Sequence, residues 1–385
     1  MTTTTTMPSL PRRDFLKTTA AVAGGLTLEL SLPLEALAAD KGAPVAHEVT
    51  AWVMIHPDDR IVIRVARSEM GQGSFTGLPM LVAEELACDW GKVSAEYASP
   101  NEHVRRNRIW QSMSTGGSAA IRTSQEYLRR AGATAREMLI AAAAQQWGVP
   151  ASECTAANSV ITHVPSKREV TFGKVAEAAA KLEPPKEVKL KDPKDWTLIG
   201  QSMKRFDIPD KVMGKPVFGI DAVVPGMVYA AIVQCPIFGG KLKLIDSSAA
   251  EKMRGVLRIV AVDEWVAVVA DNWWRAQQAT KKLKIEWDDR GNGAVSSESI
   301  LEFFKQGLDD PTTPTAKKVG DIAPAFASAA KVVEAEYFAP FLNHATLEPQ
   351  TCTASIKDGK VEVWTSTQNA EASMSAAAEA AGVKL

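Results

Sequence analysis

Apolar and polar residues alternate over residues 49–66, on both sides of a Pro-Asp-Asp-Arg turn at 57–60. Alternation interrupted by turn-forming residues is typical of a β-hairpin, because successive side chains of a strand point to opposite faces. In this interpretation Ile61, Ile63 and Val65 share one face of the second strand. The pattern therefore predicts a hairpin whose second strand buries these three side chains.

Two later stretches carry apolar residues at helical spacing, and a glycine-containing turn precedes each of them. Residues three and four apart lie on one face of a helix, so each stretch predicts an amphipathic helix packed on a core. The apolar positions of the first helix are Leu78, Leu81, Val82 and Leu86. Those of the second, which is expected to stop near residues 148–150, are Leu128, Ala131, Ala135, Met138, Leu139 and Ala142.

The remaining patterns divide the rest of the chain. Residues 181–194 are rich in Lys, Glu and Pro without apolar periodicity, which favours a linker. Residues 295–330 are rich in Ala, Pro and Ser and are interpreted as a connecting arm. Between these segments, a small α+β domain is predicted from strands at 228–234, 255–262, 265–270 and 283–287 and a helix at 273–283. The last segment is expected to form strands at 351–356 and 360–364 and a helix at about 371–381.

Composition excludes several classes of protein. The 385 residues carry 44 Lys and Arg against 45 Asp and Glu, a balance that argues against a general nucleic-acid binder. No stretch approaches the ~20 consecutive apolar residues that span a bilayer. The four cysteines form no CxxC pair, and the five histidines form no HxH or HExxH motif. A locally encoded iron–sulfur or zinc site is therefore not expected.

The N-terminus has the features of an export signal. Arg12 and Arg13 are followed by Asp-Phe-Leu-Lys, then by a short, weakly apolar run, and Ala-Leu-Ala at 36–38 supplies a small–x–small cleavage pattern. The paired arginines resemble a twin-arginine signal, although Pro11 replaces the usual Ser or Thr. Residues 1–38 are therefore expected to be a removable twin-arginine signal peptide, and the mature protein is expected in the periplasm.

Two glycine turns are the first candidates for chemistry. Glycine lets a backbone approach an anion closely, and free N–H groups before a helix stabilise negative charge. Neither turn fits GxGxxG or the Walker lysine pattern, and such a turn by itself is more often only a turn. The first glycine turn consists of Gly71, Gln72 and Gly73, and the second of Gly116, Gly117 and Ser118.

Two further motifs lie near the end of the chain. His344 is followed by Ala-Thr-Leu-Glu-Pro, which includes Glu348, and a Ser-Thr-Gln-Asn sequence includes Gln368. A single His beside a Glu is usually a structural pair, and polar residues often end strands. Neither motif alone specifies a function.

Taken together and in this order, four motifs resemble the molybdopterin-binding subunit of the xanthine oxidase superfamily: residues 67–73 and 114–118, which include the two glycine turns, and residues 344–349 and 367–368. The order is that of the isoquinoline 1-oxidoreductase beta-subunit group, which includes aldehyde and nicotinate dehydrogenases. The resemblance implies an α+β fold with an N-terminal molybdopterin-binding domain at 45–200, an a/b hammerhead domain at 205–292 and the beginning of a second molybdopterin-binding domain at 293–385. Residues 215–221, Lys-Pro-Val-Phe-Gly-Ile-Asp, carry the hammerhead resemblance.

The resemblance also implies an activity. Members of the family oxidise an aldehyde or an N-heterocycle with oxygen derived from water. Their molybdenum is held by a molybdopterin, usually the cytosine dinucleotide form in bacteria, so no protein ligand to the metal is implied. Electrons are expected to leave through a 2Fe–2S subunit, with a cytochrome c as a further candidate partner.

Individual residues follow by matching the motifs. Both glycine turns are expected to contact the pterin dinucleotide. Gln368 matches the glutamine that hydrogen-bonds the apical oxo group of the molybdenum, and Glu348 matches a position near the substrate pocket. The family's glycine-rich GGGFG stretch and its catalytic glutamate would lie beyond Leu385, so the chain is expected to be an N-terminal half that is inactive alone. The alternative is a non-catalytic pterin-binding or assembly module that contributes half a site to a separate chain.

Overall fold

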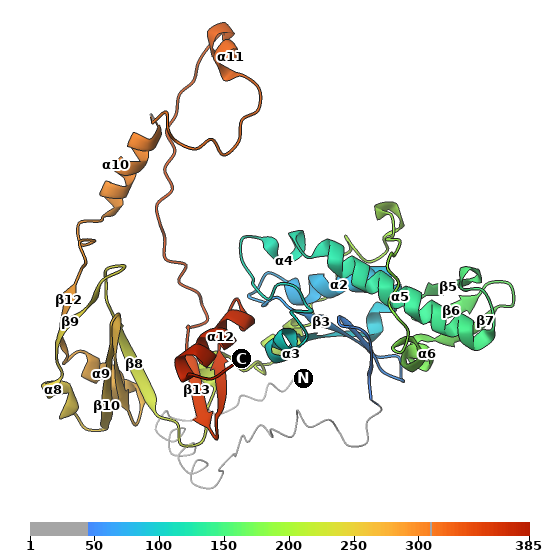
Figure 1. Cartoon of the computed structure of the whole chain (residues 1–385), viewed down its shortest axis with the longest axis horizontal. Coiled ribbons are helices and arrows are strands. Elements are labelled where there is room, and N and C mark those ends of the chain that lie inside the picture. Colours follow the sequence, from blue (N-terminus) through green and yellow to red (C-terminus); the bar gives the residue numbers. More distant parts are fainter. Residues whose placement is uncertain (1–44, 309) are drawn as a thin grey trace, which may run out of the picture. The chain divides into compact units, whose positions relative to one another are not determined.

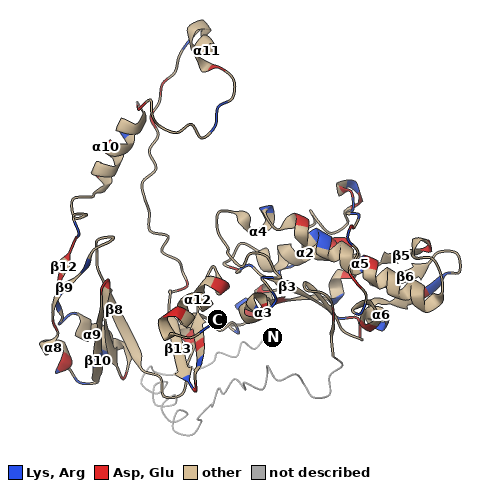
Figure 2. Ribbon diagram, viewed as in Figure 1, with Lys and Arg blue, Asp and Glu red and all other residues tan. Residues whose placement is uncertain are grey.

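The computed structural model describes residues 45–308 and 310–385. The proposed signal peptide at 1–38 lies outside these residues. The chain divides into two compact units. Of the described residues, the first unit contains 45–216, 356–361 and 367–385, and the second contains 217–308, 310–355 and 362–366. Acidic and basic residues are interspersed in both units (Figure 2).

A four-stranded sheet forms the base of the first unit. Its strands, in the order β1-β2-β3-β4, are β1 (His47–Thr50), β2 (Val53–Ile55), β3 (Ile61–Val65) and β4 (Val93–Tyr97). β2 and β3 are antiparallel and pair Val53 with Ile63, which confirms the predicted hairpin. Ile61, Ile63 and Val65 are buried on one face, as expected. β4 runs parallel to β3 and was not predicted.

The two predicted amphipathic helices pack on this sheet. They are α2 (Ser74–Leu86) and α5 (Gln125–Trp147), which lie side by side in Figure 1. The helices approach closely at Gly132 of α5, where an added Cβ would lie 2.2 Å from the carbonyl oxygen of Val82. Only a residue without a side chain fits between two helices at this distance. α5 ends at Gly148, which has a φ of 68°.

The second glycine turn opens a shorter helix than the sequence predicts. α4 (Ala119–Arg122) follows the turn, and α5 begins only after Ser124. The hydroxyl of Thr123 bonds back to the carbonyl of Ala119, and both the Thr123 and Ser124 hydroxyls accept hydrogen bonds from Arg67. These side-chain contacts at residues 123–124 accompany the break in the helical run.

Residues 181–194 are not a free linker, which corrects the interpretation from composition. Glu84 and Glu85, at the end of α2, have fully buried side chains. The Glu85 carboxylate accepts the backbone N–H of Lys191, and Glu84 accepts the Lys191 ammonium. Arg136 of α5 also donates to the Lys189 carbonyl. Two buried carboxylates and α5 therefore hold this segment against the first unit.

The other elements of the first unit surround this core. β5, β6 and β7 form an antiparallel sheet in that order. The bounds are η2 (Trp90–Lys92), α3 (Pro100–Arg105), η3 (Ala151–Glu153), β5 (Cys154–Ala157), β6 (Val160–His163), β7 (Arg168–Thr171), α6 (Phe172–Ala179), η4 (Pro193–Asp195), α7 (Ile208–Val212) and α12 (Ala370–Ala381).

The second unit contains the predicted α+β pattern. β10, β11 and β8 form one antiparallel sheet in that order, and β12 pairs with β9. β9 was missed because its sequence alternates lysine with leucine on a largely exposed strand. The elements are η5 (Gly219–Asp221), β8 (Tyr229–Gln234), β9 (Lys241–Asp246), α8 (Ser248–Glu251), β10 (Val256–Val262), β11 (Trp265–Ala270), α9 (Trp273–Thr280) and β12 (Lys284–Asp288).

The predicted connecting arm contains two helices, α10 (Ser297–Leu308) and α11 (Ile322–Ser328). The expected final hairpin is confirmed as β13 (Cys352–Lys357) paired with β14 (Lys360–Thr365), and the expected final helix is α12. No helix among the described residues is long and apolar enough to cross a membrane.

Candidate functional site

Segments that carry three of the sequence motifs meet within the first unit. Ser68, which precedes the first glycine turn, donates its N–H to the Thr115 hydroxyl at 2.8 Å and its hydroxyl to the Thr367 carbonyl at 2.8 Å. Thr115 precedes the second glycine turn, and its N–H donates to the Gln368 carbonyl at 2.7 Å. The structure thus brings residues about 250 to 300 positions apart to one place.

Two of the three N–H groups of the first glycine turn are not free. Gly71 and Gly73 donate to the carboxylate of Glu69 at 2.7 and 3.0 Å, and Phe75 of α2 donates to it at 2.9 Å. At Gly71 and Gly73 the expectation of N–H groups open to an anion is therefore wrong, because a carboxylate of the chain already accepts both. Whether other atoms of residues 71–73 contact a cofactor stays a prediction.

The side chain of Gln72 is engaged within the same turn. Its amide nitrogen donates to the Ser68 carbonyl and to the Ser74 hydroxyl, each at 2.8 Å, and its amide oxygen accepts the Met70 N–H. These contacts hold the turn in one shape.

Glu69 is a functional candidate that sequence reasoning missed. Its side chain is 3% exposed, and it also pairs with Arg205 at 3.1 Å. Burial, the largest single influence, raises the pKa of Glu69, but the N–H groups of Phe75, Gly73 and Gly71 and the charge of Arg205 together lower it below its usual value. Glu69 is therefore held as a carboxylate. The only sequence signal was an acidic residue two positions before a glycine turn.

The second glycine turn presents the opposite arrangement. Gly117 and Ser118 have φ values of 55° and 54°. Within the described part of the chain, the N–H groups of Gly116, Gly117 and Ser118 donate to no other group. An added Cβ at Gly116 or Gly117 would meet no atom within 4 Å, so the backbone borders open space. Successive free N–H groups in such a turn can hold an anion.

A buried arginine braces this turn. Arg67 is 4% exposed and donates from one guanidinium nitrogen to the Ser112 hydroxyl and the Ser114 carbonyl, and from the other to Thr123 and Ser124. Its Nε has no hydrogen-bond partner among the described residues, and no carboxylate there pairs with it. A buried charge without a counter-charge is costly, so a bound anion nearby would be favoured.

Gln368 lies against the second glycine turn. Its side-chain nitrogen donates to the Thr115 carbonyl at 2.8 Å, which leaves a second hydrogen of the same amide for another acceptor. Asn369 caps α12 by accepting the Ala372 N–H. Glu371 of α12 bonds Arg108 at 2.6 Å and lies 3.4 Å from His103, beside α3 (Figure 1). The start of α12 is thereby fixed to the same unit as the turn.

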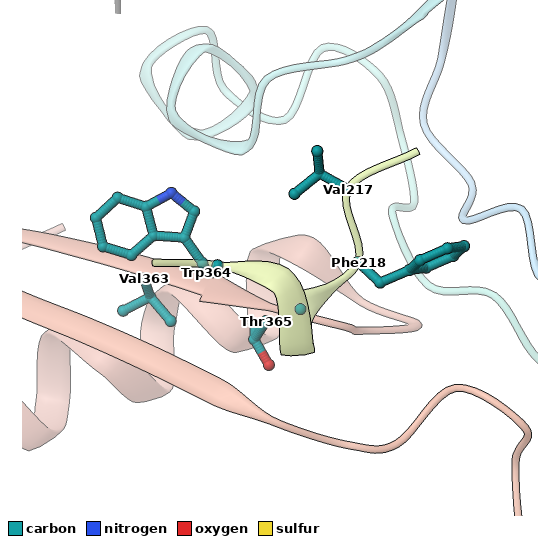
Figure 3. A pocket seen from close by; sticks show the side chains of 7 residues that line it. Val217, Phe218, Val363, Trp364 and Thr365 are labelled. Carbon is teal, nitrogen blue, oxygen red and sulfur yellow. The ribbon is translucent and has the colours of Figure 1, made fainter. Parts of the chain in front are cut away.

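Glu348 belongs to the second unit and accepts the N–H of Gly219 at 3.4 Å. Gly219 lines a cavity of about 270 Å³ with Val217, Phe218 and Ala222 and with three residues of β14 (Figure 3). The β14 residues are Val363, Trp364 and Thr365. Apolar side chains dominate this lining, which suits a small apolar group. His344 is exposed, as is most of the segment around it.

The comparisons with known proteins define the family. A molybdopterin cofactor-binding domain matches residues 30–231, just over half of the chain, and a second such domain matches residues 308–385. The chain belongs to the molybdopterin-binding subunits of the xanthine oxidase family. Its mixture of helices and strands agrees with this assignment.

Several curated relatives are similar over most of the chain. The membrane-bound aldehyde dehydrogenase [pyrroloquinoline-quinone] of Gluconacetobacter polyoxogenes is 31% identical over 92% of this chain and 47% of its own length. The isoquinoline 1-oxidoreductase subunit beta of Brevundimonas diminuta is 29% identical over 94% of this chain and 53% of its own. The chain thus spans about half the length of these relatives.

Solved structures of similar proteins match smaller parts. The aldehyde oxidoreductase of Desulfovibrio gigas is 22% identical over 50% of this chain and 27% of its own, with a TM-score of 0.34. Quinoline 2-oxidoreductase of Pseudomonas putida 86 is 18% identical over 44% of this chain and 27% of its own, with a TM-score of 0.33.

The residues present fit a molybdopterin at one of the two turns. The second glycine turn offers free N–H groups, open space and a nearby buried arginine, which suit a phosphate-bearing group. The first glycine turn offers no free N–H group at Gly71 or Gly73. Among the described residues, no group of three or more His, Cys, Asp or Glu side chains could hold a metal ion.

Proposed function

We propose that the chain is part of a molybdenum hydroxylase that oxidises an aldehyde or an N-heterocyclic aromatic compound with oxygen derived from water. The main support is the meeting of Ser68, Thr115 and Gln368, which places the second glycine turn and the Gln368 amide at one site in a chain of the molybdopterin-binding family. Relatives named aldehyde dehydrogenase and isoquinoline 1-oxidoreductase support this substrate class.

The second glycine turn would hold the phosphate end of the cofactor, for which we propose the cytosine dinucleotide form. Residues 116–118 would donate their free N–H groups, and Arg67 would supply positive charge behind them. Gln368 would direct its remaining amide hydrogen toward the cofactor. When bound, the molybdopterin supplies a molybdenum centre that accepts two electrons from the substrate.

The second unit would carry the substrate side of the reaction. We propose that residues 205–292 form an a/b hammerhead domain and that Glu348 borders the substrate pocket. The apolar cavity beside Gly219, whose N–H contacts Glu348, supports a planar, weakly polar substrate. A 2Fe–2S subunit, or a cytochrome c, would receive the electrons.

The test uses a complete subunit, in which this chain is joined to the part of the Brevundimonas relative that lies beyond the matched half. The purified complete subunit is expected to contain molybdenum and pterin at about one per chain and to reduce an artificial electron acceptor with aldehydes or N-heterocycles. Because the Gluconacetobacter relative is named for pyrroloquinoline quinone, the quinone content is measured on the same sample. A sample that contains quinone but no molybdenum would contradict the proposal. A sample that contains molybdenum but shows no turnover would also contradict it and would favour the non-catalytic module.

We also propose export to the periplasm by the twin-arginine route, supported by Arg12, Arg13 and the Ala-Leu-Ala sequence at 36–38. Replacing both arginines with lysine is expected to retain the uncleaved precursor in the cytoplasm, because the route reads the arginine pair. Cell fractionation and N-terminal sequencing measure this, with the Lys17→Arg variant as the control. Export of the double variant at the rate of the wild type would defeat the assignment.

A further inference from the structure

The first and second glycine turns differ in one respect that their sequences do not reveal. Glu69 accepts the N–H groups of both glycines of the first turn, whereas the N–H groups of all three residues of the second turn stay free among the described residues. A cofactor phosphate would therefore meet a carboxylate at the first turn and unoccupied donors at the second. Like charges repel, and paired donors gain nothing from a second anion.

Arg205 completes the arrangement around Glu69. One of its nitrogens donates to the Gly71 carbonyl at 2.8 Å and another donates to Glu69, so Gly71 is held through both its N–H and its carbonyl. Asp207 in turn holds Arg205 through two hydrogen bonds of 2.9 and 2.6 Å, and Lys211 pairs with Asp207. Asp207 thus fixes the position of the Arg205 guanidinium independently of its contacts with the first glycine turn.

We propose that Glu69 and Arg205 are positioning residues of the cofactor site, which fix the first glycine turn against a buried carboxylate and so direct the cofactor's phosphates to the second. The part of this inference that concerns the cofactor rests on the proposed function, whereas the contacts of Glu69 and Arg205 do not depend on it. Glu69 acts here as an internal anion that accepts the glycine N–H groups of the turn. The first turn then borders the cofactor site but does not bind the phosphates.

A second carboxylate in the same unit provides a matched control. Glu84 is fully buried and accepts the N–H groups of Thr197, Leu198 and Ile199, and it pairs with Lys191. It therefore combines three backbone donors and one cation, as Glu69 does, but it holds a segment outside both glycine turns. Glu69→Ala and Glu84→Ala remove the same type of interaction from two different places.

Amide hydrogen exchange of the 385-residue chain measures the turn directly. In the Glu69→Ala variant, exchange at Gly71, Gly73 and Phe75 is expected to become at least about tenfold faster, because each amide loses its acceptor. Glu84→Ala should leave these three amides unchanged and accelerate those of residues 197–199. Unchanged exchange at the first turn in a folded Glu69→Ala variant would overturn the proposal.

Exogenous formate separates positioning by charge from simple packing. Glu69→Ala leaves three N–H donors and Arg205 around a space of carboxylate size, which formate can enter. Formate is expected to restore slow exchange at Gly71, Gly73 and Phe75, and sodium chloride at equal ionic strength is not. Failure of formate to restore any protection would show that Glu69 acts only by filling space.

The pH dependence provides a third readout. Because the pKa of folded Glu69 lies below its usual value, its stabilisation of the turn is complete above that usual value and is lost as the pH falls through the lowered one. The charged and titratable groups facing it are Arg205, Tyr97 and, through Arg205, Asp207 and Lys211. In wild-type protein, protection of the three amides relative to their intrinsic exchange rate at each pH should therefore persist below the usual pKa of a glutamate, and its loss already at that usual pKa would contradict the proposal.

The complete subunit tests the link to the cofactor. Its Glu69→Ala variant should lose molybdenum on gel filtration, formate kept in the buffer throughout should prevent this loss, and Glu84→Ala should retain the metal without formate. If the wild type itself holds no molybdenum, the proposed function fails while the exchange results still decide the role of Glu69. If Glu69→Ala does not fold, Arg205→Met tests the same contact, with faster exchange at Gly71 expected and unchanged exchange contradicting the proposal.

Discussion

Replacing Gly116 with valine in the complete subunit is expected to reduce its molybdenum and pterin content about tenfold or more, which corresponds to ~1.4 kcal/mol of lost binding free energy. Gly116 has no positive φ, and an added Cβ would meet no atom of the chain within 4 Å. The chain itself therefore tolerates a side chain at this position. A cofactor that approaches the free N–H groups of residues 116–118 would collide with such a side chain.

The melting temperature makes this prediction specific. Because the substitution meets open space, the free energy of unfolding should change by about 0.5 kcal/mol or less. Gly307 of α10 is the matched control, since it too lacks a positive φ and borders open space. Gly307→Val should retain the metal. Full metal content in Gly116→Val would show that the second glycine turn does not hold the cofactor.

The equivalent change at Gly73 is a poorer test than the sequence suggests. Gly73 has a φ of 87°, a conformation that valine strongly disfavours, whereas the space beside it is open. Gly73→Val is therefore expected to distort the turn through backbone strain before any cofactor is involved. Loss of the metal in that variant would not identify a direct contact.

Replacing Gln368 with alanine in the complete subunit is expected to lower kcat about 10²–10³-fold while the molybdenum content stays near that of the wild type. The Gln368 amide donates one hydrogen to the Thr115 carbonyl, and this bond fixes the direction of its second hydrogen. A fixed donor aimed at charge that develops during the reaction contributes more to the rate than to binding of the cofactor.

A structural role for Gln368 predicts a different result. If its amide only satisfies Thr115, the variant should lose about 1 kcal/mol of stability and keep its rate. Asn369 is the neighbouring control, because its side chain caps α12, and Asn369→Ala should cost about 1 kcal/mol without changing kcat. Metal content, melting temperature and kcat are measured on one preparation. A metal-loaded Gln368→Ala enzyme with the wild-type kcat would eliminate the catalytic role.

Local patterns predicted most of the regular structure. The alternation around residues 57–60 identified the β2–β3 hairpin, and helical spacing identified α2 and α5, because both patterns reflect burial of one face of an element. β4 was missed because its parallel partner β3 lies about 30 residues earlier, and nothing in its own sequence specifies that pairing. α10 and α11 were not predicted because the composition of residues 295–330 is typical of loops.

Sequence motifs identified segments that the structure brings together, but they did not predict the contacts between these segments. The motifs identified both glycine turns and Gln368, and the structure brings Gln368 to Thr115, beside the second turn. The roles of Arg67 and Glu69 could not be predicted, because each depends on partners far along the chain or on the direction of backbone N–H groups. A sequence shows that glycine permits a turn, but it does not show which acceptor binds the N–H groups of that turn.

The bonds that join Ser68 and Thr115 to residues 367–368, and Arg108 to Glu371, have a consequence for biosynthesis. They close loops of about 250 to 300 residues, whereas the β2–β3 hairpin and the α2–α5 pair form within short stretches near the N-terminus. Contacts so distant in sequence form slowly, because ordering the intervening chain costs conformational entropy. On the ribosome, the N-terminal core can therefore fold well before residues 367–371 emerge. The contact between Gln368 and Thr115 would then form only after that core has folded, which would leave the second glycine turn open to a cofactor until synthesis has passed α12.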